Sequence, residues 1–153
     1  MNLLVGRDQD VGAWVAEQLP QFDGPDDFGP FTAIGVIDSE GYIAAGVVFH
    51  NYLPRYRNVE ITMASVTPRW VSRSVLSGIM AYPFQQLGCV MVRTTTPRKN
   101  RAALTFNKKM GFHIDAVIRR GFGSQDAVIG TLLAKEWRQS KFNLQREVMS
   151  EAA

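Results

Sequence analysis

Two arginines and several hydroxyl side chains are concentrated in one segment, SVTPRWVSRSVLSG at residues 65–78. Its pattern indicates the end of a strand followed by the start of a helix. Thr67 before Pro68 is one good helix cap, and Ser72 is a rival cap. Either start leaves backbone N–H groups without helical partners, at the helix end that favours negative charge. The segment therefore predicts a phosphate site, with an exposed polar first turn as the alternative. The predicted phosphate contacts are Arg69, Ser72, Arg73 and Ser74.

The composition limits what kind of protein can carry this segment. With 153 residues, 46% of them hydrophobic, the chain is expected to form one domain with a proper core. A net charge of +3 favours anionic ligands only weakly. One cysteine, Cys89, excludes an internal disulfide, and two histidines are too few to predict a metal site. Short apolar runs and the absence of a secretion signal lead us to expect a cytoplasmic protein without membrane spans.

Hydrophobic periodicity predicts the elements that position the segment. Helical patterns cover residues 8–22, a stretch ending near Gly88 and residues 100–111, and Pro83 should kink the second helix. Strand patterns cover a hairpin at 31–52, then 58–66, 89–96, 112–122 and 126–137. The order is β-α-β-β-β-α-β-α-β-β, which predicts a mixed sheet covered by helices. We expect a single domain at 1–137 and a tail at 138–153 that frays or forms an interface helix.

Three motifs carry a resemblance to a known family. They are NRAALTFNKKMGF at 100–112, AYPFQQLG at 81–88 and DAVIGTLLAKEW at 126–137. From residue 31 onward, their order and spacing resemble the GNAT superfamily of N-acetyltransferases, and in particular its branch that acetylates the N-termini of ribosomal proteins. The resemblance implies an α/β fold with a twisted, mostly antiparallel mixed sheet of about seven strands and helices on both faces.

The resemblance also implies a reaction. Acetyl-CoA would be the donor, and an amine would attack its thioester directly, without an enzyme nucleophile. Such chemistry needs a base for the ammonium proton, a hydrogen-bond donor for the oxyanion and an acid for the thiolate. The pyrophosphate of the cofactor would lie on the N–H groups between the fourth strand and its helix.

Glu60 is the residue that the resemblance assigns as the base. It lies six residues before Val66, a spacing similar to that in the histone-acetylating branch. Partial burial beside apolar neighbours would raise the pKa of such a carboxyl, which could then accept a proton, through a water if needed. The alternative is a solvent-exposed Glu60 paired with Arg55 or Arg57.

Six further residues are expected to contact the cofactor. The backbone at Ser65, Val66 and Thr67 would pair with the pantetheine arm. Asn100 would bond the same arm or cap the following helix, or both, and Ala103 would leave room for it. Asn107 shares the face of Ala103 but stands where many family members have the tyrosine acid. Tyr52, Tyr56 or a water are the candidates to replace that acid.

The sequence leaves three functions open. The first is transfer of acetyl from acetyl-CoA to an amine, by a monomer or homodimer. The second, less favoured, is a phage-type enzyme of this fold that modifies nucleic acid, consistent with the arginines of LPRYRN at 53–58. The third is a non-catalytic binding protein, because the tyrosine and the usual glycines of the phosphate turn are missing. His50 is an alternative base, although a lone histidine at a strand end is more often solvated. The loops at 23–30 and 50–58 are expected to shape the acceptor pocket.

Overall fold

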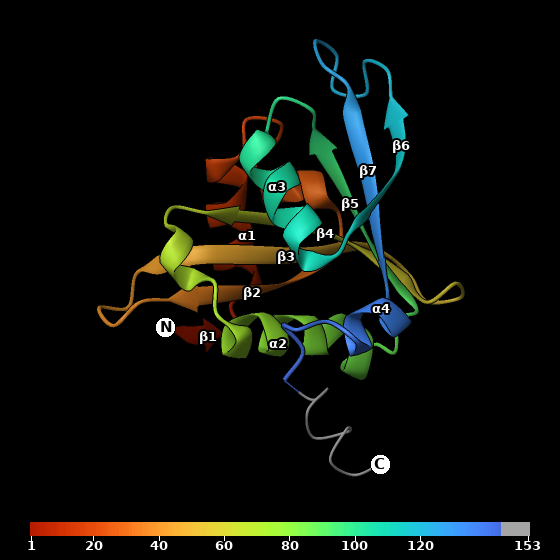
Figure 1. Cartoon of the computed structure of the whole chain (residues 1–153). Coiled ribbons are helices and arrows are strands. Elements are labelled where there is room, and N and C mark those ends of the chain that lie inside the picture. The colour runs from red at the N-terminus through yellow and green to blue at the C-terminus, as the bar shows by residue number, and fades with distance from the viewer. Residues whose placement is uncertain (145–153) are drawn as a thin grey trace.

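The computed structural model describes residues 1–144, in which seven strands form one sheet (Figure 1). The strands are β1 (Asn2–Leu4), β2 (Phe31–Ile37), β3 (Ile43–Leu53), β4 (Asn58–Ser65), β5 (Met91–Pro97), β6 (His113–Ile118) and β7 (Ala127–Leu133). The α-helices are α1 (Asp8–Gln18), α2 (Arg73–Ala81), α3 (Arg101–Met110) and α4 (Ala134–Arg138). Short helical turns are η1 (Pro25–Phe28), η2 (Pro68–Trp70) and η3 (Tyr82–Gln86). This is the predicted order of elements, with α4 added.

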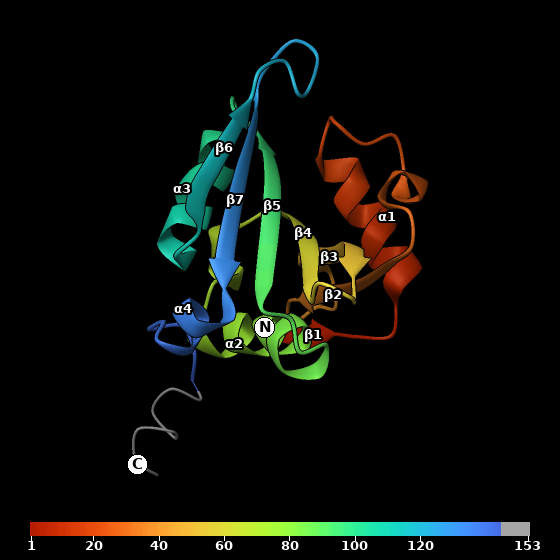
Figure 2. The ribbon, with the colours of Figure 1, turned by 90° about the vertical axis from the view of Figure 1, so that its right-hand side faces the viewer.

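The sheet has the order β1-β2-β3-β4-β5-β7-β6, and every neighbouring pair is antiparallel except β4 and β5. Helix α1 lies on one face, and α2 and α3 lie on the other (Figure 2). Gly46 of β3 lets α1 approach closely, since a Cβ atom there would stand 2.6 Å from the Val15 side chain. The predicted class, a mostly antiparallel mixed sheet with helices on both faces, is confirmed.

The parallel pair β4–β5 is short. Its register runs only from Asn58 opposite Met91 to Glu60 opposite Arg93. Beyond that point the two strands separate, and β5, β7 and β6 rise away from the layer of β1 to β4 (Figure 1). Residues 61–65 of β4 still pair with β3 on their other side. Their backbone groups on the β5 side therefore have no ladder partner, which is an unusual state for a strand in the middle of a sheet.

Two apolar cores hold the layers together. The larger core packs α2 against the sheet through residues such as Leu76, Ile79 and Ile61. The smaller one packs α1 against β3 through Val11, Val15 and Val48. Because each core belongs to one face of the sheet, the opening between β4 and β5 is flanked by a separate packed layer on either side.

Local signals explain where the helices end. The α-helical pattern of α2 stops at Ala81, and η3 follows as a π-type turn in which the N–H of Leu87 donates to the carbonyl of Tyr82. Pro83, which lacks an N–H, lies inside this turn, so the predicted interruption is confirmed. Gly111 ends α3 in the left-handed conformation (φ 101°), also as predicted.

The last predicted strand is too long. The strand predicted at 126–137 ends at Leu133, and residues 134–138 form α4, whose Glu136 side chain accepts from the N–H of Leu133. The signal was present in the sequence, because a Glu at the third helical position is typical of a capped helix start. Trp137 is buried in the larger core, where its ring stacks on Phe84.

Part of the predicted tail is packed. Phe142 lies against the larger core, Asn143 is buried, and the N–H of Leu144 donates to the hydroxyl of Ser77. The rest of the tail, 145–153, lies outside the described residues. Within residues 1–144, every helix falls short of the length and apolar character needed to cross a membrane.

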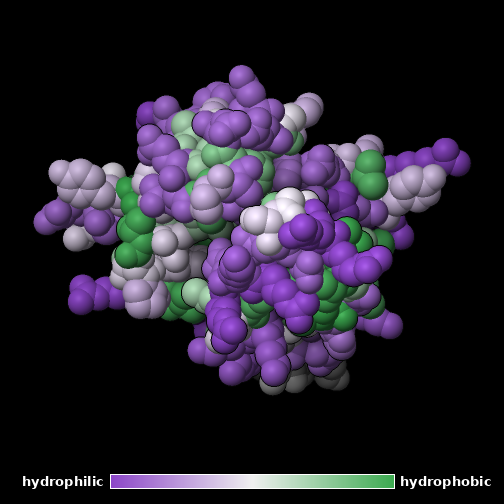
Figure 3. Space-filling view, turned by 90° about the horizontal axis from the view of Figure 1, so that it is seen from above, coloured by the Kyte–Doolittle hydropathy of each residue, from purple (hydrophilic) through white to green (hydrophobic). Residues whose placement is uncertain are grey.

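The upper surface is mainly hydrophilic, and its apolar areas are separated from one another by hydrophilic side chains (Figure 3). Two groups of exposed apolar side chains are Tyr52, Leu53 and Tyr56 near the β3–β4 turn, and Ile114, Val117 and Ile118 on β6.

Candidate active site

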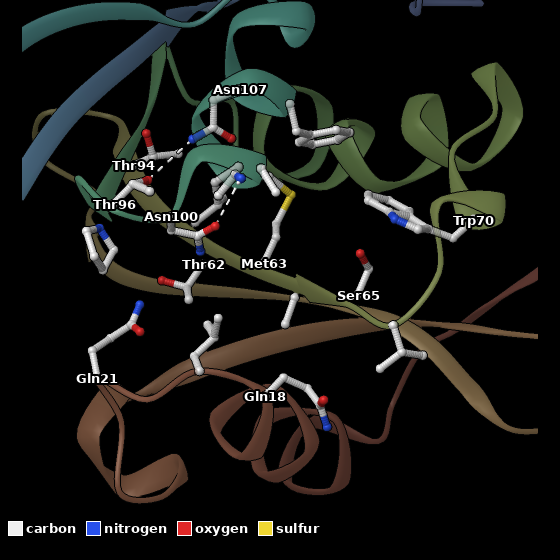
Figure 4. A pocket seen from close by; sticks show the side chains of 18 of the residues that line it. Gln18, Gln21, Thr62, Met63, Ser65, Trp70, Thr94, Thr96, Asn100 and Asn107 are labelled. Carbon is white, nitrogen blue, oxygen red and sulfur yellow. Dashed lines mark hydrogen bonds between the residues drawn. The ribbon is translucent and has the colours of Figure 1, made fainter.

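A cleft of about 550 Å³ lies in the opening between β4 and β5 (Figure 4). It is lined by residues 61–65 of β4 and 94–97 of β5. Asn100, Ala103 and Phe106 line it from α3, and Gln18 and Gln21 line it from the α1 side. The cleft is therefore bordered by elements from both faces of the sheet.

Six of the predicted site residues line this cleft. They are Ser65, Val66, Thr67, Asn100, Ala103 and Asn107. Ser65 is the last residue of β4, and Val66 and Thr67 follow it, whereas Asn100 caps α3 and Ala103 and Asn107 lie on one side of that helix, as the helical spacing required. The structure thus brings together two segments that are about 35 residues apart in the sequence, and both were predicted from their motifs.

Both rival caps in the predicted phosphate turn are present. The Thr67 hydroxyl accepts from the N–H of Arg69 at 3.2 Å and caps η2. The Ser72 hydroxyl accepts from the N–H of Val75 at 3.1 Å and caps α2, which starts at Arg73. The chain thus turns twice where a single helix start was expected, because Val71 interrupts the helix with an extended conformation.

The remaining residues of the turn stand at the rim of the cleft. Arg69, Ser72, Arg73 and Ser74 are exposed and lie outside the cleft lining, whereas Pro68, Trp70 and Val71 line it. The first N–H groups of α2 have no partner within the helix, as at any helix start. Two arginines beside such a start give the rim a local positive charge.

Asn100 caps α3, because its side-chain oxygen accepts from the N–H of Ala103 at 3.2 Å. Its amide nitrogen is directed into the cleft, toward Thr62 (Figure 4). The two roles anticipated for this residue are therefore compatible, since the cap uses only the oxygen. Asn107 is buried, and its amide donates to the Thr96 hydroxyl at 3.4 Å, which ties α3 to β5.

Glu60 lies at the point where β4 and β5 separate. Arg93 Nη1 donates to its Oε1 at 3.2 Å, and the amide of Asn51 donates to the same oxygen at 3.1 Å. The carboxylate is mostly buried, with 15% of the side chain exposed. The partner of Glu60 is therefore Arg93, and the exposed position paired with Arg55 or Arg57 that was the alternative is wrong. Glu60 comes one residue before the first lining residue of β4 and lies outside the cleft lining.

His50 is buried against the sheet, contrary to the solvated position that is usual for a histidine at a strand end. Its Nε2 lies 2.7 Å from the Thr62 hydroxyl and 3.9 Å from Oε2 of Glu60. The ring of Phe28 packs edge-on against it. Burial lowers the pKa of His50, the charge of Glu60 raises it and that of Arg93 lowers it further, with a net lowering. The imidazole is therefore neutral near pH 7.

Several lining residues were not singled out from the sequence. Thr62 is the polar member of a strand that is otherwise apolar in its middle, and the run TTTP at 94–97 puts three hydroxyls at a strand end. These two features were the sequence signals that could have indicated the polar lining of the cleft. Gln18 and Gln21 follow from no local pattern, because only the packing of α1 on β3 brings them to the cleft. Tyr52, near the end of β3, and Tyr56, in the following turn, are exposed and outside the lining, as are Arg55 and Arg57.

No family model matches the sequence, and no curated protein matches it either. Solved structures do match. A chimera of the spermidine N-acetyltransferase SpeG from Vibrio cholerae and hSSAT has a TM-score of 0.72 at 13% identity, over 90% of this chain and 99% of that one. Mutant forms of the spermidine/spermine N-acetyltransferase SpeG from Vibrio cholerae give 0.70 at 12% identity, over 90% and 97%. A dodecameric spermidine N-acetyltransferase from the same organism gives 0.61 at 15%, over 71% and 68%.

These similarities establish the fold. The chain has the architecture of GNAT-fold acetyltransferases, as the three sequence motifs predicted, and it is matched along nearly the whole length of the first two structures. The finer resemblance to the branch acting on ribosomal proteins stays a prediction. At 12–15% identity, these similarities show the fold alone and not the reaction or its substrates.

Proposed function

We propose that the protein is an N-acetyltransferase that moves the acetyl group of acetyl-CoA to an amine. The observation that carries the proposal is the cleft between β4 and β5, which is lined from both faces of the sheet and by unpaired strand edge. A cofactor arm can enter from the α3 side while an acceptor enters from the α1 side. Direct transfer requires such an arrangement, because donor and acceptor must be held together in one site.

The residues of the cleft suit acetyl-CoA. Backbone groups of residues 61–65 that lack a partner strand match the amides of a pantetheine arm, which could pair with them as another strand would. Asn100 offers an amide donor, and Ala103 leaves space beside it. Arg69 and Arg73, with the start of α2, are the proposed contacts of the pyrophosphate. When bound, acetyl-CoA supplies the activated acetyl group as a thioester.

The residues on the other side suit a neutral or cationic amine. Gln18 and Gln21 can hydrogen-bond such a group at the α1 side of the cleft. Glu60 is the proposed proton acceptor, acting through a water because its carboxylate lies outside the cleft lining. The amine is proposed to be primary, and the solved structures with this fold include enzymes named for spermidine and spermine. Polyamines are therefore the first acceptors to test.

Mass spectrometry of reaction mixtures tests the proposal. The protein is incubated with acetyl-CoA and, separately, with spermidine, spermine, a small monoamine and a set of peptides with free N-termini. We expect one acceptor class to gain a single acetyl group with equal release of free CoA. The control is the Ala103→Phe variant, which should fill the cleft without removing a polar group. Release of CoA without an acetylated product from any amine would contradict the proposal.

A further inference from the structure

A continuous chain of polar contacts runs from β5 to the wall of the cleft. Arg93 donates to Glu60, and Glu60 accepts from the amide of Asn51. The same amide nitrogen lies 3.2 Å from Nδ1 of His50, and Nε2 of His50 lies 2.7 Å from the Thr62 hydroxyl. Thr62 is the last member and the only one of these five that lines the cleft.

The chain fixes the proton positions on His50. An amide nitrogen carries two hydrogens, and the Asn51 amide must present nitrogen to Glu60, because a carboxylate can only accept. Its second hydrogen then points at Nδ1 of His50, which must therefore be the unprotonated ring nitrogen. In the neutral ring the proton is on Nε2, and this N–H donates to the Thr62 oxygen. The Thr62 hydroxyl hydrogen is thus left to point elsewhere.

The backbone of Asn51 makes this chain possible. β3 has an irregularity between His50 and Leu53, and Asn51 there is left-handed, with φ 49°. Asparagine adopts this conformation more readily than most residues. Arg93 also donates to the carbonyl of Asn51 at 2.7 Å, which holds the bulged residue in place.

Each element packed against His50 presents an identified group to its ring. β4 presents Glu60, β5 presents Arg93, and η1 presents the uncharged ring of Phe28. The strand partner on β2 is Phe31. The ring is thus held between one acid and one base, and burial lowers its pKa, which favours the neutral form.

Resting on the proposed function, we propose that Thr62 donates its hydroxyl hydrogen to the thioester carbonyl oxygen of bound acetyl-CoA. Thr62 is then a catalytic residue, and His50 is a positioning residue that acts through it. Thr62 stands two residues past the point where β4 leaves β5, so its hydroxyl is at the narrow end of the cleft. A hydroxyl that accepts a hydrogen bond from His50 becomes a better donor itself. The arrangement supplies the oxyanion donor that direct transfer needs.

Nuclear magnetic resonance of the ring nitrogens tests the proton positions without any substrate. The chain has only two histidines, so labelled His50 is assigned by comparison with the His113→Gln variant. Couplings between ring nitrogens and carbon-bound hydrogens distinguish the two neutral tautomers. We expect the form with hydrogen on Nε2 at pH 7. The form with hydrogen on Nδ1 would overturn the proposal, because Thr62 would then donate to His50 and face the cleft as an acceptor.

Kinetics tests the role in transfer. Thr62→Val should lower kcat by about 100-fold, the scale of losing one oxyanion donor, with little change in KM for acetyl-CoA. Thr62→Ser keeps the hydroxyl and should restore most of the rate. The matched control is Thr32→Val, which removes a strand hydroxyl that accepts from Tyr82 at 3.1 Å, outside the cleft lining. It should leave kcat unchanged.

The outcomes separate this inference from the proposed function. If the unmodified protein transfers acetyl and Thr62→Val is as fast, the inference fails and the function stands. In the unmodified protein, kcat is expected to decrease at low pH as the base is protonated. If this decrease disappears in His50→Gln, the inference about Thr62 is also overturned, because His50 would then be the base. If the unmodified protein transfers nothing, the proposed function fails, whereas the tautomer of His50 is still decided by the resonance experiment.

Discussion

Glu60 and Arg93 form an ion pair, 3.2 Å from Oε1 to Nη1, at the last register position that β4 and β5 share. Both side chains are mostly buried, with 15% and 21% exposed. The pair lies where the sheet divides, so one contact both holds the proposed base and joins β4 to β5 at the point where the two strands separate. The ion pair thereby fixes the position of the Glu60 carboxylate relative to the opening between β4 and β5.

Replacement of Glu60 by glutamine should leave acetyl-CoA binding intact and lower kcat by about 100-fold or more, the usual contribution of a positioned base. Titration calorimetry measures the first quantity and initial rates the second. Arg93→Met breaks the same ion pair but keeps the carboxylate, so it should lose less turnover. Equal losses in the two variants would remove Glu60 as the base, as would a fully active Gln variant.

Arg69 and Arg73 should contribute to binding only when the acetyl donor carries phosphate groups. Arg69→Ala and Arg73→Ala should each weaken acetyl-CoA binding by about tenfold, the scale of one charge-assisted contact. Neither should change the KM for S-acetyl-pantetheine, which lacks the pyrophosphate. Arg55→Ala removes an exposed arginine far along the chain and serves as the charge control. The phosphate assignment is wrong if both donors are affected alike.

Asn100 should show separable roles. Serine is also a good helix cap, so Asn100→Ser should keep the free energy of unfolding within about 0.5 kcal/mol and yet bind acetyl-CoA about fivefold more weakly, because the amide donor is gone. Asn100→Ala should lose the donor and about 1 kcal/mol of stability as well. Denaturant unfolding and calorimetry report the two effects. Unchanged affinity in the serine variant would leave Asn100 as a cap alone.

His50 should make stability depend on pH. Its pKa is lowered in the folded protein, chiefly by burial, so the unfolded chain binds more protons as the pH falls through the unfolded value near 6.5. The free energy of unfolding contributed by this group is full above that pH and decreases as the pH drops toward the folded pKa. Melting temperatures measured from pH 7.5 to 5 should fall less steeply in His50→Gln. The same slope in His50→Gln and in the control His113→Gln would contradict this origin.

Much of the fold could be predicted because its signals are local. Two apolar runs marked the hairpin and a strand pattern marked β4, Gly111 marked the end of α3, and Pro83 marked the interruption of the second helix. Where two local signals competed, as with Thr67 and Ser72, both were present in the structure. The strand predicted at 126–137 overran into α4 because the apolar pattern continues and only the cap at Glu136 opposes it.

The site could be predicted only in part. Motifs on β4 and α3 located residues that share the cleft, since the fold itself brings these elements together. The partners of Glu60 and His50 could not be predicted, because they depend on where the short β4–β5 register stops and on an irregular backbone at Asn51. Such long-range register is not encoded in any single segment.

A thermal shift with acetyl-CoA is the most direct test of whether the cleft between β4 and β5 binds this donor. Ligand at about a hundred times its Kd should add roughly 2.7 kcal/mol to the free energy of unfolding, which raises Tm by about 5 °C or more for a domain of this size. We expect this shift for the unmodified protein and its loss in Ala103→Phe. No shift at millimolar acetyl-CoA, or an equal shift in the variant with the filled cleft, would contradict it.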